Sequence, residues 1–136
     1  MKEVRELIHT RKQGVKEIDI QAAEDKLAVT FPEQYRDLFK LVNNAEIGEW
    51  ILYPVKDEGN PKSWDDVVRQ NTEVREDRMP GDFIAIGEDG SGDKLCLKTS
   101  NGIIEDQIYL WYHETAEVED YAASLREFIV RKTEEG

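Results

Sequence analysis

Residues 87–94, with the sequence GEDGSGDK, combine glycines with residue types that could hold a phosphate or a metal ion. A phosphate-binding P-loop requires Lys and then Ser or Thr directly after its last glycine, but here an acid follows, and three acids would repel phosphate. A calcium loop of the EF-hand type requires glycine where Lys94 stands and glutamate where Ser100 stands. We therefore expect a hairpin turn in which Gly90 and Gly92 adopt positive φ, with acids that are solvated or form a contact surface.

The remaining candidates for catalysis or metal binding are few. Cys96 lies between Leu95 and Leu97 in a predicted strand, where a free cysteine is commonly a buried core residue. A single cysteine permits neither an internal disulfide nor a cysteine-based zinc site. His113 has only His9 as a fellow histidine, which is too few for a multi-histidine metal site. We expect a protein that is not an enzyme and that carries no metal or cofactor.

Length and charge limit the classes of protein to which the chain can belong. The 136 residues correspond to one domain, and 18 basic against 30 acidic side chains give a net charge of −12. This excess of acid repels phosphate and disfavours binding to nucleic acids or anionic membranes. The N-terminus carries charges where a signal peptide needs an apolar stretch, and no apolar run is long enough to span a membrane. A cytoplasmic location is expected.

The charge is distributed unevenly along the chain. Residues 1–16 carry five bases and two acids, whereas residues 79–125 carry two bases and ten acids, a net charge of −8. A concentrated acidic field can steer a basic partner and speed its docking. It can equally be a solvated face that only keeps the protein soluble, and the sequence leaves both interpretations open.

Apolar residues at helical spacing predict two short helices near the N-terminus. The first lies within an N-terminal extension, residues 1–16, and stops near Gly14. The second begins at Asp19, whose carboxylate can accept hydrogen bonds from the free N–H groups of the first turn as an N-cap.

A third and stronger helix is predicted over residues 30–42, where an apolar stripe recurs at helical spacing. Thr30 and Glu33 have the spacing of a capping box. The helix is expected to stop at Asn43-Asn44, because asparagine tolerates the left-handed conformation.

The second half of the chain changes to β character. The predicted elements are a strand over residues 50–55, a helix over 64–77 with a start signal at Ser63 and Asp66, strands over 83–87, 94–99 and 103–113, and a helix over 117–132. Strands clustered between helices indicate a single α+β domain with a mainly antiparallel sheet. Helices should pack on this sheet, and the expected order after the N-terminal extension is α-α-β-α-β-β-β-α.

Two motifs resemble the SUKH superfamily. The sequence FPEQYRDLF at residues 31–39, which contains Pro32 and Tyr35, resembles the motif that introduces this superfamily. The strand-turn-strand segment 83–97 resembles its second signature, with glycines at Gly87, Gly90 and Gly92. The resemblance covers residues 18–129, and it implies an α+β fold in which these motif positions determine the fold.

The resemblance also implies a binding protein. Most bacterial members are immunity proteins that neutralise a cognate polymorphic toxin, often a nuclease, and a yeast cell-wall-assembly regulator shares the domain. An acidic protein can occupy the basic phosphate-binding surface of a nuclease, so we expect a basic toxin as the partner. The alternatives are a regulatory adaptor without a toxin partner and an enzyme or small-ligand binder, for which a deep pocket of polar side chains with shifted pKa values would be required.

Candidate contact residues follow from exposure and charge. Trp64 follows an exposed loop and is either a core residue or an amphipathic anchor for a partner. The acidic candidates lie in or near the glycine-rich turn and in two other predicted loops: Glu46, Glu49, Glu88, Asp89, Asp93 and Asp106.

Overall fold

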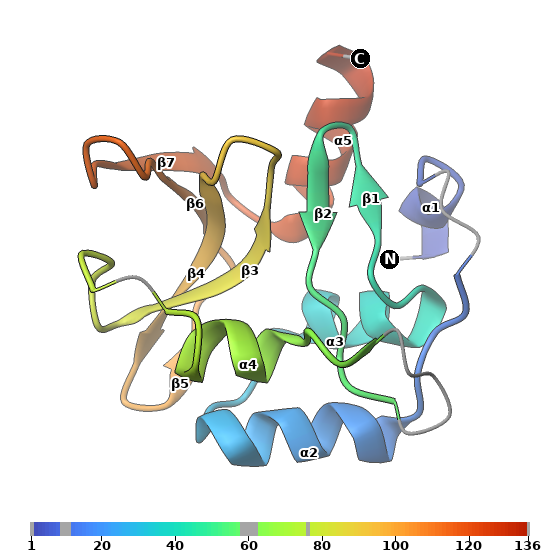
Figure 1. The fold of residues 1–136 in the computed structure, drawn as a ribbon. Coiled ribbons are helices and arrows are strands. Elements are labelled where there is room, and N and C mark those ends of the chain that lie inside the picture. Colours follow the sequence, from blue (N-terminus) through green and yellow to red (C-terminus); the bar gives the residue numbers. More distant parts are fainter. Residues whose placement is uncertain (1, 9–11, 58–62, 76, 136) are drawn as a thin grey trace.

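A computed structural model describes residues 2–8, 12–57, 63–75 and 77–135 of the protein. Its strands form one curled antiparallel sheet in the order β1-β2-β3-β4-β6-β7, with β5 paired to β4 (Figure 1). The strands are β1 Glu46–Ile47, β2 Trp50–Leu52, β3 Phe83–Glu88, β4 Lys94–Ser100, β5 Ile103–Ile104, β6 Ile108–Trp111 and β7 Val118–Ala122. The helices are α1 Lys2–Arg5, α2 Glu17–Leu27, α3 Glu33–Leu41, α4 Val67–Thr72 and α5 Leu125–Glu135. The predicted α+β class with an antiparallel sheet is confirmed.

Helix α3 carries the densest part of the core. Phe31, Tyr35 and Phe39 are buried, and the ring centroid of Tyr35 lies 4.9 Å from that of Phe31 and 4.5 Å from that of Phe39. The predicted apolar stripe is confirmed, and Asn44 adopts the left-handed conformation with φ of 61°. None of the described helices is both long and apolar enough to cross a membrane.

The predicted starts of α2 and α3 are wrong. Helix α2 begins at Glu17 after Lys16, so Asp19 lies inside the first turn and is not the N-cap. Helix α3 has Pro32 as its N-cap and no side-chain cap, so the expected capping box is absent. Thr30 instead forms a parallel bridge to Ile103, and its N–H donates to the Gly102 carbonyl over 3.0 Å. The backbone of Thr30 therefore hydrogen-bonds to the β4–β5 turn and does not cap the helix.

Gly14 is required by packing and not by the end of a helix. Helix α1 ends at Arg5, well before Gly14, and residues 9–11 of the predicted N-terminal extension lie outside the described residues. A Cβ atom at Gly14 would lie 2.0 Å from the Lys40 carbonyl oxygen. The neighbouring Val15 N–H donates to the Phe39 carbonyl over 2.8 Å, so this segment lies against the end of α3. Only glycine permits that approach.

The β3–β4 hairpin forms as predicted, but its glycines have different roles. Gly92 has a φ of 102°, whereas Gly90 is absent from the glycines with positive φ, so the expectation for Gly90 is wrong. Gly87 lies at a bulge between β3 and β4, where a Cβ would meet the Ile51 carbonyl oxygen at 2.8 Å. Gly87 is therefore needed because strand β2 approaches closely.

Strand β2 and helix α4 are shorter than predicted. Strand β2 ends at Leu52, because Val55 instead exchanges two hydrogen bonds with the side chain of Asn43. Helix α4 begins at Val67 and not at Trp64, and its N-cap is Asp66, which accepts from the Arg69 N–H, so the predicted start signal lies in the right segment but the predicted start is wrong. Helix α4 stops at Thr72, beyond which the Arg75 guanidinium turns back to the carbonyl of Phe83.

The largest error concerns the last predicted helix. Residues 118–122 form the edge strand β7, and α5 begins only at Leu125. Ser124 caps α5 by accepting from the Glu127 N–H at 3.2 Å, and the Glu127 carboxylate reaches back to the N–H of Ala123 at 2.7 Å. Strand β6 would otherwise leave its backbone groups unpaired, and that requirement overrides the local helical spacing.

Candidate functional site

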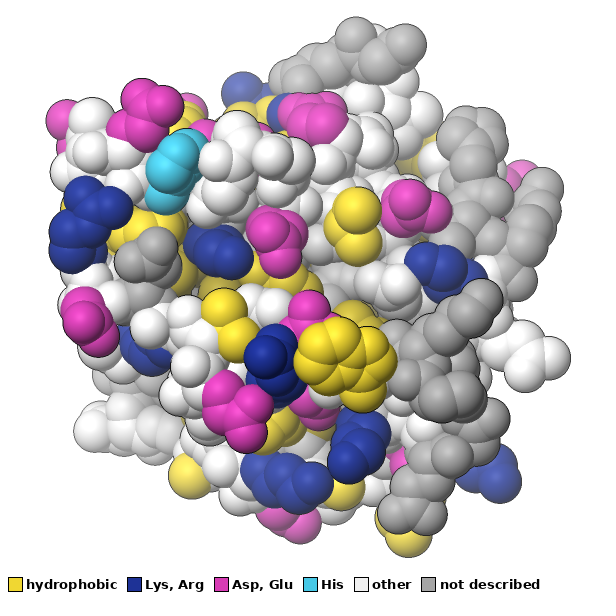
Figure 2. Space-filling view, viewed as in Figure 1, with side chains coloured by type: hydrophobic (Ala, Val, Ile, Leu, Met, Phe, Trp, Pro, Cys, Tyr) yellow, Lys and Arg dark blue, Asp and Glu magenta, His cyan; other side chains and the backbone are white. Residues whose placement is uncertain are grey.

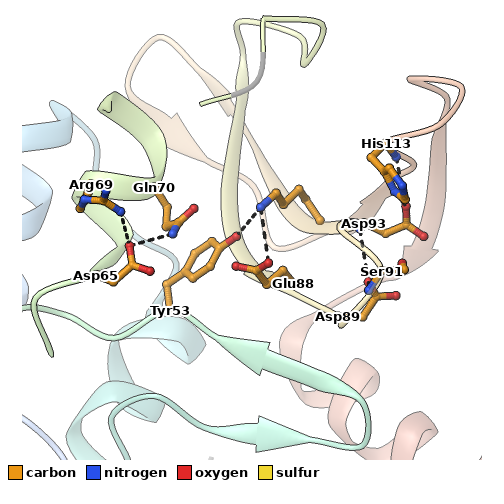
Figure 3. Close-up of polar contacts among 10 residues, drawn as sticks. Tyr53, Asp65, Arg69, Gln70, Glu88, Asp89, Ser91, Asp93 and His113 are labelled. Atoms are coloured by element: carbon orange, nitrogen blue, oxygen red, sulfur yellow. Dashed lines mark hydrogen bonds and ion pairs between the residues drawn. The ribbon is translucent and has the colours of Figure 1, made fainter. Parts of the chain in front are cut away.

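An open groove lies on the face of the sheet where β2 and β3 meet, next to the segment that leads into α4. Its volume is about 390 Å³. The lining residues are Asn44, Ile51, Tyr53, Pro54, Asp65, Glu88, Asp89 and Gly90. Figure 3 shows Tyr53, Asp65, Glu88 and Asp89 among them. The floor therefore has apolar parts, and the walls carry three carboxylates.

The strand register places several of these side chains on one face. Glu46, Ile51, Glu88 and Lys94 are opposite one another in successive strands from β1 to β4. Residues opposite one another in neighbouring strands project from the same face of a sheet. Ile51 is 44% exposed in the middle of this row. The sheet thus presents an apolar side chain between two acids beside the groove.

The Tyr53 hydroxyl in the groove lining is held by Lys94. The Lys94 ammonium donates to the Tyr53 hydroxyl oxygen over 3.0 Å and lies 3.8 Å from a Glu88 carboxylate oxygen. Burial of Tyr53, together with the negative charge of Glu88, raises the pKa of its phenol. The hydroxyl therefore stays protonated near neutral pH, which suits a binding group better than an acid–base catalyst.

Asp65 forms the opposite wall, and the described residues that bind it all contact the same oxygen. Its Oδ1 accepts from the Arg69 guanidinium over 2.7 Å and from the Gln70 amide over 2.8 Å. Its Oδ2 makes no hydrogen bond to any residue that the structure describes, and Figure 3 shows Asp65 and Glu88 on the two sides of Tyr53. One oxygen of this carboxylate is thus available for a further donor.

Trp64 stands directly beside Asp65. Its side chain is 63% exposed, and the Arg69 guanidinium lies 4.9 Å from its ring centroid. The same guanidinium binds Asp65 and Glu73, so the tryptophan is held by a positioned cation. An exposed but ordered aromatic of this kind is typical of an interface anchor.

The β3–β4 turn uses its acids differently. Asp89 Oδ1 accepts from the N–H of Ser91 at 2.9 Å, from its hydroxyl at 2.7 Å and from the N–H of Asp93 at 3.2 Å. Asp93 Oδ1 accepts from the His113 N–H at 3.0 Å and lies 2.7 Å from His113 Nδ1. Partial burial acts to raise the pKa of Asp93, but the hydrogen bonds from His113 outweigh it, and the pKa is lowered. These two carboxylates fix the turn.

The ten acids of residues 79–125 do not form one surface. Six of them lie at the upper end of the sheet in Figure 1, in or beside the β3–β4 and β6–β7 turns: Glu88, Asp89, Asp93, Glu114, Glu117 and Glu119. Three lie at the opposite end, namely Asp82, Glu105 and Asp106, and Asp120 lies within β7. On the face shown in Figure 2, acidic and basic side chains alternate, with hydrophobic side chains exposed between them.

Comparison with protein families assigns the chain to a family. The family model SUKH_5, described as SMI1-KNR4 cell-wall, matches residues 1–134. The chain belongs to the SMI1-KNR4 cell-wall family. The SUKH superfamily, to which this family belongs, includes immunity proteins and domains similar to a cell-wall regulator. A comparison with curated proteins gave no match.

In this SUKH domain, the predicted contact residues fall into separate places. Trp64, Glu88 and Asp89 lie at or beside the groove, and Glu46 lies in the same cross-strand row. Three others lie elsewhere: Glu49 contacts Lys132 of α5 at 3.4 Å, Asp93 faces His113, and Asp106 lies at the opposite end of the sheet.

Sequence reasoning missed Ile51, Tyr53 and Asp65 as groove residues. Ile51 and Tyr53 stand in the apolar run WILYPV, which predicts a strand but not which side chains face outward. Asp65 stands between Trp64 and the N-cap Asp66. Its position beside a candidate anchor tryptophan was the only sequence feature that could have marked it as a groove residue.

Two of the motif residues and the single cysteine occupy structural positions. Tyr35 is buried in the core, and Pro32 is the N-cap of α3. Cys96 is buried as predicted, and burial raises the pKa of its thiol to about 12, which suppresses the nucleophilic thiolate. Among the described residues, no group of His, Cys, Asp and Glu side chains is arranged to hold a metal ion.

Proposed function

We propose that this SUKH protein is a cytosolic immunity protein that binds and neutralises a cognate polymorphic toxin without catalysing a reaction. The observation that carries this proposal is the groove, in which carboxylates from two walls surround exposed apolar surface beside Trp64. Membership of a superfamily that includes immunity proteins supports the same function.

The charge of the protein favours a nuclease as the toxin. A nuclease presents a basic surface to phosphate, and acidic side chains can occupy that surface in place of nucleic acid. The six acids at the groove end of the sheet supply an attractive field, while the groove supplies local contacts. Electrostatic attraction of this kind mainly speeds association and weakens as salt concentration rises.

The proposal is tested with the toxin domain encoded beside the gene. We expect a stable complex on gel filtration and restored growth when both proteins are expressed together. The association rate should fall steeply with salt, because long-range steering is screened. A toxin domain that neither binds nor is neutralised contradicts the proposal. A stable complex with a protein that is not a toxin would instead favour the regulatory adaptor.

Trp64 provides a test of the binding face. Trp64→Ala should weaken toxin binding by about 30-fold or more, as expected of an interface anchor worth about 2 kcal/mol. Ile103 is a matched control, because it is 68% exposed on β5 at the far end of the sheet. Ile103→Ala should leave affinity unchanged. Equal affinities of the two variants would remove the groove face from the interface.

A further inference from the structure

We propose that the groove binds one arginine side chain of the protein partner, with its guanidinium between Asp65 and Glu88. The inference rests on the proposed function for the biological partner, but the chemistry of recognition follows from the groove itself. The inference specifies which basic group binds between the acidic walls of the groove, and therefore which type of residue anchors the partner.

The size of the groove fits a side chain. Its volume of about 390 Å³ lies near the lower end of the range of about 300–1,000 Å³ that proteins use for small ligands. Ile51, which is 44% exposed, offers apolar surface for the methylene stem of a long basic residue, and the buried Tyr53 and Pro54 line the groove beside it. A stem of this kind lets the charged head reach the two carboxylates.

The two walls present acceptors from different elements. Asp65 comes from the segment before α4, and its Oδ2 makes no hydrogen bond to a described residue. Glu88 comes from the end of β3, and the Lys94 ammonium lies 3.8 Å from its carboxylate. That separation exceeds the length of a hydrogen bond, and the carboxylate also interacts with the Tyr53 hydroxyl. A carboxylate has about four acceptor sites, so Glu88 keeps acceptor capacity for an incoming donor beside this contact.

A guanidinium suits this arrangement better than an ammonium. It is planar, has five N–H donors and is weakly hydrated, so it can bridge two carboxylates while it lies against an aromatic ring. The rim of the groove already contains such an arrangement, because Arg69 stacks on Trp64 and donates to Asp65. The Lys94 ammonium already occupies the compact site beside the Tyr53 hydroxyl.

The experiment is an NMR titration with three blocked Gly-Ser peptides that differ in one central residue: arginine, lysine or the neutral isostere citrulline. Signals of Ile51, the Trp64 indole N–H and Gly90 report on the groove. We expect localised shifts with the arginine peptide, binding about tenfold weaker with lysine, and no binding with citrulline. Equal affinity for arginine and lysine, shifts spread over the acidic residues, or no shift would overturn the inference.

Matched variants separate recognition from net charge. Asp65→Asn combined with Glu88→Gln should abolish the localised shifts. Glu105→Gln combined with Asp106→Asn changes the net charge equally at the opposite end of the sheet and should retain them. Equal losses in both double variants would mean that only overall charge acts, which contradicts the inference.

The toxin complex distinguishes failure of the inference from failure of the proposed function. If the Asp65/Glu88 variant binds the toxin as tightly as the wild type, the groove does not hold the partner's anchor and the inference falls, while the immunity function stands. If the wild type binds the arginine peptide but no toxin, the immunity function falls and arginine recognition stands.

Discussion

The groove and the β3–β4 turn lie next to each other and contain the same residue types, yet their acids do different work. In the turn, the carboxylates of Asp89 and Asp93 accept hydrogen bonds from the turn itself and from His113. In the groove, the described residues that donate to Asp65 all bind one of its oxygens, and Glu88 lies 3.8 Å from the Lys94 ammonium. Asp89 lines the groove but, like Asp93, stabilises the turn, whereas Asp65 and Glu88 keep acceptor capacity for a partner.

This difference shows why acidity alone is a poor guide to an interface. Charge reversal in the turn would remove hydrogen bonds on which the backbone depends, so a loss of binding there would report on folding. Charge removal in the groove leaves the backbone intact and reports on recognition. The predictions below test that separation, starting with the largest expected effect.

Two glycines mark the boundary between the regions. Gly87→Ala should destabilise the protein by about 3 kcal/mol, because the new Cβ would lie 2.8 Å from the Ile51 carbonyl oxygen and push β2 away from β3. Gly90→Ala should change stability by less than about 0.5 kcal/mol, because no atom lies within 4 Å of its Cβ. Urea unfolding measures both values. Similar stabilities for the two variants would refute the close packing of the groove wall.

Asp93 should be the most important acid for stability in the turn. Asp93→Ala leaves the His113 N–H without its acceptor and should cost about 2 kcal/mol, as expected for a hydrogen bond to a charged group. Thermal unfolding followed by circular dichroism measures the loss. Asp120→Ala is the control, since this exposed acid lies on the edge strand β7. A loss as large for Asp120 as for Asp93 would contradict the special role of the turn.

Much of the fold could be predicted because the sequence pattern and the tertiary structure agree. The apolar stripe of α3 and the strands β3 and β4 follow from spacing and turn chemistry. Agreement fails at β7, where helical spacing is overridden by the pairing needs of β6. The sequence did contain a correcting signal, since Ser124 and Glu127 have the spacing of a capping box.

The candidate site was less predictable than the fold. Trp64 and Glu88 could be identified from type and context, but the groove also needs Ile51, Tyr53 and Asp65, which come from other elements. Strand register decides that Ile51 lies between Glu46 and Glu88, and register depends on pairing that no local pattern specifies. The orientation of the Asp65 carboxylate likewise depends on donors such as the Gln70 amide, and Gln70 belongs to no motif in the sequence.

The turn should also give the protein a distinct response to acid. The folded pKa of Asp93 is lowered, so its contribution to stability is complete above the unfolded pKa near 3.8 and is lost as pH falls through the folded pKa. The stability difference between wild type and Asp93→Asn should therefore shrink below about pH 4. Urea unfolding at several pH values measures it. Gly90→Ala keeps every titratable group and should follow the wild type, and a difference for Asp93→Asn that does not shrink contradicts the lowered pKa.

The smallest stability effect is expected where the effect on binding should be largest. Asp65→Asn combined with Glu88→Gln should change the free energy of unfolding by less than about 0.5 kcal/mol, because both side chains are more than one third exposed and screened by solvent. The side-chain amide introduced by Asp65→Asn keeps a carbonyl oxygen that can accept from Arg69, and removal of two negative charges from an acidic chain relieves repulsion. Urea unfolding checks this value beside the peptide titration. A well-folded variant that no longer binds arginine would separate recognition from stability, whereas a destabilised variant would place the groove acids in the same structural role as Asp89 and Asp93.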